Sequence, residues 1–157
     1  MKVSEKIEHL KQKKAKIKEM GGKARIEKQH AKHKLTARER LDLLFDEGTF
    51  REIYMMVKHR STNFNMPTTE IPSDGVITGH GLVNGRPIFA YAQDFTCRGG
   101  SLGEKHAEKI VKIMDLAMKA GVPIIGMSDS GGARVEEGID SLKGYGDISS
   151  LIPELQV

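Results

Sequence analysis

The spacing of hydrophobic positions changes along the chain, and each change predicts a different element. From Val3 to Ile17, apolar residues recur at helical spacing among Lys and Glu, and Gly21-Gly22 follows as a helix stop. Because this apolar stripe is narrow, we expect the helix to lie against another subunit or domain rather than to form a core. Residues 23–35 are basic and show no regular period, which predicts an irregular segment.

The next patterns predict a helix and then three strands. Thr36 followed by Glu39 is a capping-box pattern, and it precedes the apolar positions of a helix that closes near Gly48. Beyond that helix, Asn84-Gly85 is a strong hairpin signal. The expected strands cover residues 50–57, 75–83 and 87–93, and a polar loop covers residues 61–73.

A crossover unit is expected after the hairpin. Ser101 and Glu104 fit a second capping box, and an apolar helix face continues from there until Gly121. Residues 122–127 then form an apolar run of strand length. Strand, glycine loop, helix and strand make a βαβ unit, which predicts an α/β fold with a largely parallel sheet covered by helices.

Charge is concentrated at the N-terminal end of the chain. Residues 1–40 carry a net charge of +9 and the remaining residues carry −5, within a total of +4. A basic arm on an acidic body can bind nucleic acid, an anionic cofactor or a partner's acidic face, and it can equally be a solvated helix face. The arm lacks aromatic residues and any nucleic-acid recognition motif, so nucleic-acid binding is disfavoured.

Few residues outside the glycine-rich turns suggest chemistry. Cys97 is the single cysteine, which excludes an internal disulfide and fits a reducing cytoplasm, and a passive thiol is favoured over a catalytic one. His30 and His33 have a spacing that can bind metal, but no carboxylate or cysteine cluster supports them, so we expect solvent exposure. No apolar run reaches membrane-spanning length.

The segment 128–138 is the most informative part of the chain. It places Gly131-Gly132-Ala133 directly after the apolar run 122–127, which predicts a strand, a glycine turn and a helix start. Such a turn is expected to leave backbone N–H groups unpaired, as needed where charge develops on a carbonyl oxygen. Gly99-Gly100-Ser101 forms a second turn after a strand. Neither turn is a Walker A or dinucleotide-binding motif, and the Gly-x-Ser-x-Gly nucleophile motif is absent.

Several ordered segments between about Ile7 and Ile148 resemble the carboxyltransferase subunits of biotin-dependent acyl-CoA carboxylases and related decarboxylases. The matching segments are Glu27-Lys28-Gln29-His30, Leu35-Thr36-Ala37-Arg38-Glu39-Arg40, Pro72-Ser73-Asp74-Gly75-Val76, Gln93-Asp94-Phe95-Thr96, Gly99-Gly100-Ser101, Asp129-Ser130-Gly131-Gly132-Ala133-Arg134, Glu137-Gly138-Ile139-Asp140-Ser141-Leu142 and Gly144-Tyr145-Gly146.

This resemblance implies a crotonase-like partial domain with a mixed or parallel sheet and flanking helices. It implies transfer of a carboxyl group between carboxybiotin and an acyl-CoA through an enolate, which backbone N–H groups stabilise. By the same analogy, Gly131, with Gly132 and Ala133 beside it, is assigned to one half of the thioester oxyanion hole. Gly99, Gly100 and Ser101 are candidates for shaping the same coenzyme A pocket. Basic residues of segment 23–40 are candidates to meet coenzyme A phosphates or a neighbouring subunit.

The resemblance also implies partners and an organisation for the chain. It implies that biotin is attached to a separate carrier and that a biotin carboxylase subunit is a partner. It also implies that the full-length subunit forms a homo-oligomer and contains no metal. The expected units are a basic helical arm (1–48), a partial crotonase-like domain (49–148) and a tail (149–157) that does not resemble the family. We expect a truncated subunit with little activity alone, and a reading-frame slip near Ile148 is one hypothesis for the tail. The alternative function is a non-catalytic binding module that uses the basic arm.

Overall fold

The computed structural model describes residues 2–156, and its centre is a four-stranded sheet in the order β1-β2-β3-β4. Pairs β1–β2 and β2–β3 are antiparallel, and only β3–β4 is parallel. The expectation of a largely parallel sheet is therefore wrong for these two pairs, because the chain reverses direction through the long loop between β1 and β2 and again through the β2–β3 hairpin. The strands are β1 (Arg51–Ile53), β2 (Val76–Val83), β3 (Arg86–Gln93) and β4 (Ile124–Met127).

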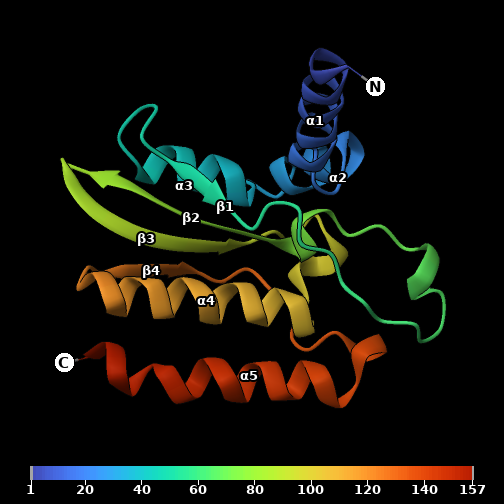
Figure 1. Ribbon diagram of the computed structural model, residues 1–157. Helices are drawn as coiled ribbons and strands as arrows, with labels where there is room; N and C mark the ends of the chain where they lie inside the picture. Colours follow the sequence, from blue (N-terminus) through green and yellow to red (C-terminus); the bar gives the residue numbers. More distant parts are fainter. Residues whose placement is uncertain (1, 157) are drawn as a thin grey trace.

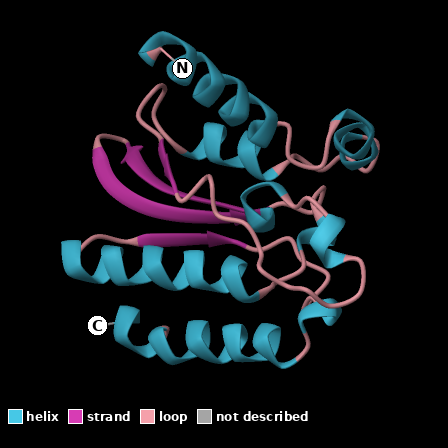
Figure 2. Ribbon diagram, turned by 45° about the vertical axis from the view of Figure 1, so that its right-hand side comes forward, coloured by secondary structure: helices cyan, strands magenta, loops and turns pink. Residues whose placement is uncertain are grey.

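Helices cover both faces of this sheet (Figure 1). Helix α3 lies on one face, α4 lies on the other, and α5 forms a further layer outside α4, as Figure 2 also shows. The segment predicted to be irregular contains helix α2, so that prediction is wrong. The helices are α1 (Val3–Lys18), α2 (Lys23–His30), α3 (Ala37–Leu44), α4 (Glu104–Ala120) and α5 (Ile139–Leu151).

The predicted crossover and hairpin are both confirmed. Strand β3, helix α4 and strand β4 form the βαβ unit, and Gly121 ends α4 in the left-handed conformation with φ 64°. The hairpin between β2 and β3 turns at Asn84 and Gly85, which both have positive φ as this tight turn requires. The first predicted strand is shorter than expected, because Tyr54 adopts φ 63° directly after β1.

The core consists of two clusters, one on each face of the sheet. On the α3 face, Leu41, Phe45, Ile77 and Ala90 are buried together. The other cluster packs α4 residues such as Ile110 and Met114 beneath α5. Full burial of one such large side chain stabilises the fold by about 1.5–3 kcal/mol. Helix α3, which the sequence assigned to the basic arm, thus contributes to the core of the sheet.

Helix α1 lies largely outside this core. Its apolar stripe leaves Val3, Ile7 and Leu10 at 74%, 50% and 45% exposed, and within the helix only Ile17 is buried. Apart from Ile17, the stripe lies outside the core as expected, and its contact with another subunit or domain stays a prediction. Among the described helices, none combines the length and apolar character needed to cross a membrane.

Candidate functional site

The two glycine turns predicted from the sequence lie side by side at the carboxyl ends of β3 and β4. The amide of Leu102 donates to the Gly132 carbonyl at 2.9 Å, and the amide of Arg134 donates to the Leu102 carbonyl at 2.9 Å. These bonds form a short parallel bridge between Leu102 and Ala133. The turns also touch at Gly100, where an added Cβ would lie 2.0 Å from the Asp129 carbonyl oxygen. The structure thus joins two separate motifs into one site.

Most amides of the second turn are already hydrogen-bonded. The Gly131 amide donates to the Gly99 carbonyl at 2.8 Å, and the Gly132 amide donates to Ser130 Oγ at 3.1 Å. The expectation that these two amides are unpaired is therefore wrong. Within residues 2–156, no hydrogen bond uses the Ala133 amide, because in a parallel bridge the partner strand bonds to the residues on either side.

The helix predicted to start at this turn is also displaced. A short 3-10 segment, Val135–Glu137, follows the turn, and α5 begins only at Ile139. The turn is consequently not the N-terminus of α5, so the α5 dipole does not add to the charge of the Ala133 amide.

The buried side chain of Arg134 stabilises the second glycine turn through hydrogen bonds. Its guanidinium is fully buried and donates to Asp74 Oδ1 at 2.6 Å and Glu137 Oε1 at 2.8 Å. It also donates to the Asp74 and Ser101 carbonyls and to Ser101 Oγ, so all five of its N–H donors have acceptors. Burial raises the pKa of the Asp74 carboxyl, and the Arg134 guanidinium opposes this shift.

This cluster replaces the helix cap predicted at Ser101. The N-terminal residue before α4 is Gly103, and Ser101 does not cap the helix. The amide of Glu104 instead donates to Glu137 Oε2 at 2.6 Å. The prediction failed because a carboxylate from a later segment of the chain satisfies the amide that a local hydroxyl would have satisfied.

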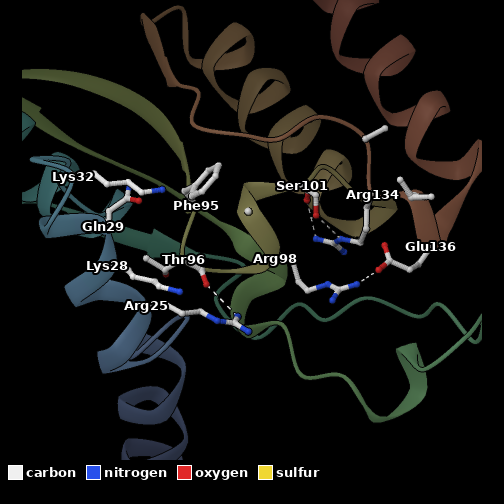
Figure 3. Close-up of a pocket in the computed structure, with 13 residues that line it drawn as sticks. Arg25, Lys28, Gln29, Lys32, Phe95, Thr96, Arg98, Ser101, Arg134 and Glu136 are labelled. Carbon is white, nitrogen blue, oxygen red and sulfur yellow. Dashed lines mark hydrogen bonds and ion pairs between the residues drawn. The ribbon is translucent and has the colours of Figure 1, made fainter.

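A cavity of about 580 Å³ opens beside the turns. One wall is α2 and the turn after it, where Arg25 and Lys28 lie on one face of the helix and Lys32 follows in the turn. The opposite wall includes Ala133 and Arg134. Figure 3 shows the three basic side chains and Gln29 on one side and Arg134 on the other. The cavity therefore lies between a cationic surface and a turn in which the Ala133 amide has no hydrogen-bond partner among the described residues.

An ion pair lies at the edge of this cavity. Arg98, which follows β3, pairs with Glu136 from the 3-10 segment (Figure 3). The carbonyl of Glu136 also accepts a hydrogen bond from Asn63 Nδ2 at 3.1 Å, so the long loop after β1 contacts the same edge. These contacts hold the second turn in place on its solvent side.

Two buried titratable side chains of α4 lie behind the turns. His106 Nδ1 is 2.8 Å from the Asp74 carbonyl, and burial lowers the pKa of His106 to about 3, so the ring is neutral at pH 7. Lys109 Nζ donates to the Ser73 carbonyl at 2.7 Å, and burial lowers the pKa of Lys109 to about 7. Both side chains brace the loop before β2 rather than face the cavity.

The structure agrees with the passive interpretation of Cys97 and with the solvent exposure expected for His30 and His33. Burial, reinforced by Asp94, raises the pKa of the Cys97 thiol to about 12, which disfavours a nucleophilic thiolate. His33 is exposed, and His30 lies 2.9 Å from Glu39 Oε1. Within the described part of the chain, no three His, Cys, Asp or Glu residues are placed to hold a metal ion.

The sequence did not single out some of the residues that line or support the cavity. The spacing of Arg25, Lys28 and Lys32 was a usable signal, but segment 23–35 had not been recognised as helical. No local signal pointed to Asp74 as the partner of Arg134, because the two residues are far apart in the sequence.

Comparison with known proteins gives consistent matches. The carboxyl transferase domain family matches residues 28–153. The methylmalonyl-CoA decarboxylase alpha subunit of Veillonella parvula is 54% identical over 99% of this chain and 32% of its own length. The propionyl-CoA carboxylase beta chain of Roseobacter denitrificans is 49% identical, over 96% of this chain and 31% of its own length.

A solved structure matches equally well. Transcarboxylase 12S with methylmalonyl-coenzyme A and methylmalonic acid bound aligns with a TM-score of 0.95 and 45% identity, over 96% of this chain and 30% of that chain. This match confirms the crotonase-like α/β fold with a mixed sheet and flanking helices. The chain spans about a third of the length of these relatives.

Proposed function

Because the chain belongs to the carboxyl transferase domain family, we propose that it supplies the acyl-CoA-binding wall for carboxyl transfer between carboxybiotin and an acyl-CoA. Three named relatives support the substrate class: a methylmalonyl-CoA decarboxylase subunit, a propionyl-CoA carboxylase subunit and a transcarboxylase with a methylmalonyl thioester bound. The observation that carries the proposal is one cavity lined both by Ala133, whose amide has no hydrogen-bond partner among the described residues, and by basic residues of α2.

The Ala133 amide is suited to the chemical step. When an acyl-CoA loses its α-proton or its carboxyl group, negative charge develops on the thioester oxygen. A fixed N–H donor with no competing acceptor stabilises that charge, and removal of one such donor typically costs about 10²–10³ in rate. The proposed donor is therefore Ala133, while Gly131 and Gly132 form the turn that presents it.

The first turn has a supporting role in this proposal. Gly99 accepts the Gly131 amide through its carbonyl, Gly100 allows close approach of Asp129, and Ser101 accepts bonds from Arg134. These three residues would shape the pocket by holding the second turn in position.

The cationic face of α2 is suited to the other end of the ligand. Coenzyme A carries phosphate groups at its nucleotide end, and Arg25, Lys28 and Lys32 line the cavity opposite Ala133. Charged donors bind phosphate more strongly than neutral donors do. Biotin, carried by a separate protein, would supply or accept the carboxyl group.

The proposal is tested by titrating the ¹⁵N-labelled chain with propionyl-CoA and following the Ala133 amide resonance. We expect a saturable downfield shift at Ala133, and we expect Lys28→Ala with Lys32→Ala to weaken the affinity about tenfold or more. Substitution of the exposed Lys119 and Lys143 to Ala is the charge-matched control and should leave the affinity unchanged. Absence of any shift at Ala133 would overturn the proposal, and salt-sensitive binding to random DNA in its place would favour the binding-module alternative.

A further inference from the structure

Helix α2 carries the cationic wall of the cavity, yet it is held by few contacts. It packs only sparsely against the other helices and strands. At its N-terminal end, the Gly21 amide donates to Thr96 Oγ1 at 3.1 Å, and Arg25 Nη1 donates to the Thr96 carbonyl at 3.3 Å. The position of the wall is therefore set largely by polar anchors rather than by apolar packing.

The anchor at the other end is Asp129. Its carboxylate accepts Gln29 Nε2 at 3.0 Å and Lys34 Nζ at 2.7 Å. The Gln29 side chain is buried, and it also donates to the Leu35 carbonyl at 3.4 Å. Gln29 shares the face of α2 that lines the cavity with the basic side chains (Figure 3). This single carboxylate thus holds the end of α2 and the segment that follows it.

The backbone of Asp129 also contacts the glycine turns. It lies two residues before Gly131, and its carbonyl oxygen packs so closely on Gly100 that no Cβ fits there. One residue therefore connects the cationic wall of the cavity to the turn that carries the Ala133 amide. A shift of this residue would change the distance between the two walls.

We propose that Asp129 and Gln29 are a positioning pair that sets the distance between the phosphate-binding face of α2 and the Ala133 amide. This inference rests on the proposed function and adds to it. A ligand that spans both walls gains from both contacts only when the walls are held at the matching separation. Asp129 does not line the cavity, and the Gln29 side-chain amide is bonded to its carboxylate, so the pair acts by positioning α2.

The alternative is that the pair only stabilises the fold. The two roles differ in their dependence on ligand length. A merely structural role would weaken every ligand to the same extent. A positioning role would weaken acetyl-CoA, which reaches both walls, and would spare acetyl-pantetheine, which has no phosphate and reaches only the turn.

The test titrates acetyl-CoA and acetyl-pantetheine into ¹⁵N-labelled wild-type chain, Asp129→Asn and Gln29→Met, with the Ala133 amide resonance as the readout. Both substitutions nearly preserve side-chain volume. We expect each variant to lose about tenfold or more in affinity for acetyl-CoA and to stay within twofold for acetyl-pantetheine. Because the two residues act through one contact, the double variant should lose little beyond either single variant.

The matched control is Asp42→Asn on the exposed side of α3, which should leave both affinities unchanged. Equal weakening of both ligands, or no weakening of either, would overturn the positioning role. If the wild-type chain itself shows no response to acetyl-CoA, the proposed function fails first, and that result is distinct from any effect of the variants. If Asp129→Asn does not fold, Gln29→Met decides between the outcomes alone.

Discussion

The His106 imidazole shows how one buried side chain ties stability to pH. It is completely buried, Nδ1 donates to the Asp74 carbonyl at 2.8 Å, and Nε2 accepts from Gln93 Nε2 at 3.0 Å. This arrangement requires the neutral ring with the proton on Nδ1. Protonation would place a second donor against the Gln93 amide and a charge beside the Arg134 guanidinium.

We therefore expect the chain to lose stability as pH falls below 6.5. The pKa of His106 is lowered to about 3 in the folded state from an ordinary value of 6.5, so between these values the unfolded chain binds more protons. The free energy of unfolding should fall by up to about 1.4 kcal/mol per pH unit from this group alone. Urea denaturation of wild type and His106→Gln between pH 7 and about pH 4 measures the difference in slope.

Other groups titrate in the same range, and a comparison of variants separates them. Asp74 and the surface carboxylates are present in both proteins, so only the difference between the two slopes reports His106. The exposed His33→Gln variant should keep the wild-type slope. Equal slopes for wild type and His106→Gln would show that the buried ring does not control this dependence.

Local signals in the sequence predicted residue roles only where a role depends on neighbours in the chain. The Thr36 cap and the Gly121 helix stop were predictable, because both depend on the adjacent turn of helix. The amide left free in the second turn was not predictable. Which amide is free depends on the Gly99 carbonyl and on the bridge to Leu102, and both come from a distant segment.

Helix α5 offers a test at the scale of one element, because two of its glycines differ in their surroundings. A Cβ at Gly144 would lie 2.5 Å from Ala107 Cβ on α4, whereas a Cβ at Gly146 would meet nothing within 4 Å. We expect Gly144→Ala to destabilise the chain by about 1–3 kcal/mol through overpacking at the helix contact. We expect Gly146→Ala to stabilise it by about 0.5–1 kcal/mol, because alanine favours helix.

The two substitutions control each other, since they make the same change two residues apart in one helix. Urea denaturation at fixed pH gives both free energies. Changes of the same sign would contradict the close contact between α4 and α5. The sequence placed both glycines in one family-like segment, Gly144-Tyr145-Gly146, and the α4–α5 contact gives a physical reason for the first.

Elements were predictable to the extent that they have a strong period of their own. Helix α4 and the β2–β3 hairpin were predicted closely because each is long or carries a specific turn signal. Helix α2 was missed because its eight residues bury only Gln29 and therefore show no apolar period. Its position depends on polar contacts with Thr96 and Asp129, which no local pattern encodes.

At the scale of the whole molecule, the surface over α5 is unusually apolar. Val135, Ile139 and Leu142 are 83%, 80% and 62% exposed, and α5 is the outermost layer in Figure 1. On the other side of α4, strand β4 is an edge of the sheet and pairs only with β3 among the described strands. Exposed apolar patches and open strand edges both favour association.

We therefore expect the chain to self-associate in solution, with the α5 surface as the main cause. Light scattering over a dilution series should show an average mass that rises above one chain with concentration. Ile139→Lys with Leu142→Lys should return the mass toward that of one chain, because two charges cannot be buried at an apolar contact without partners. Leu43→Lys removes a similarly exposed leucine, 76% exposed on α3, and should leave association unchanged. A wild-type chain that stays monomeric throughout the series would contradict the expectation, and unchanged association of the α5 variant would move the contact to the β4 edge or to α1.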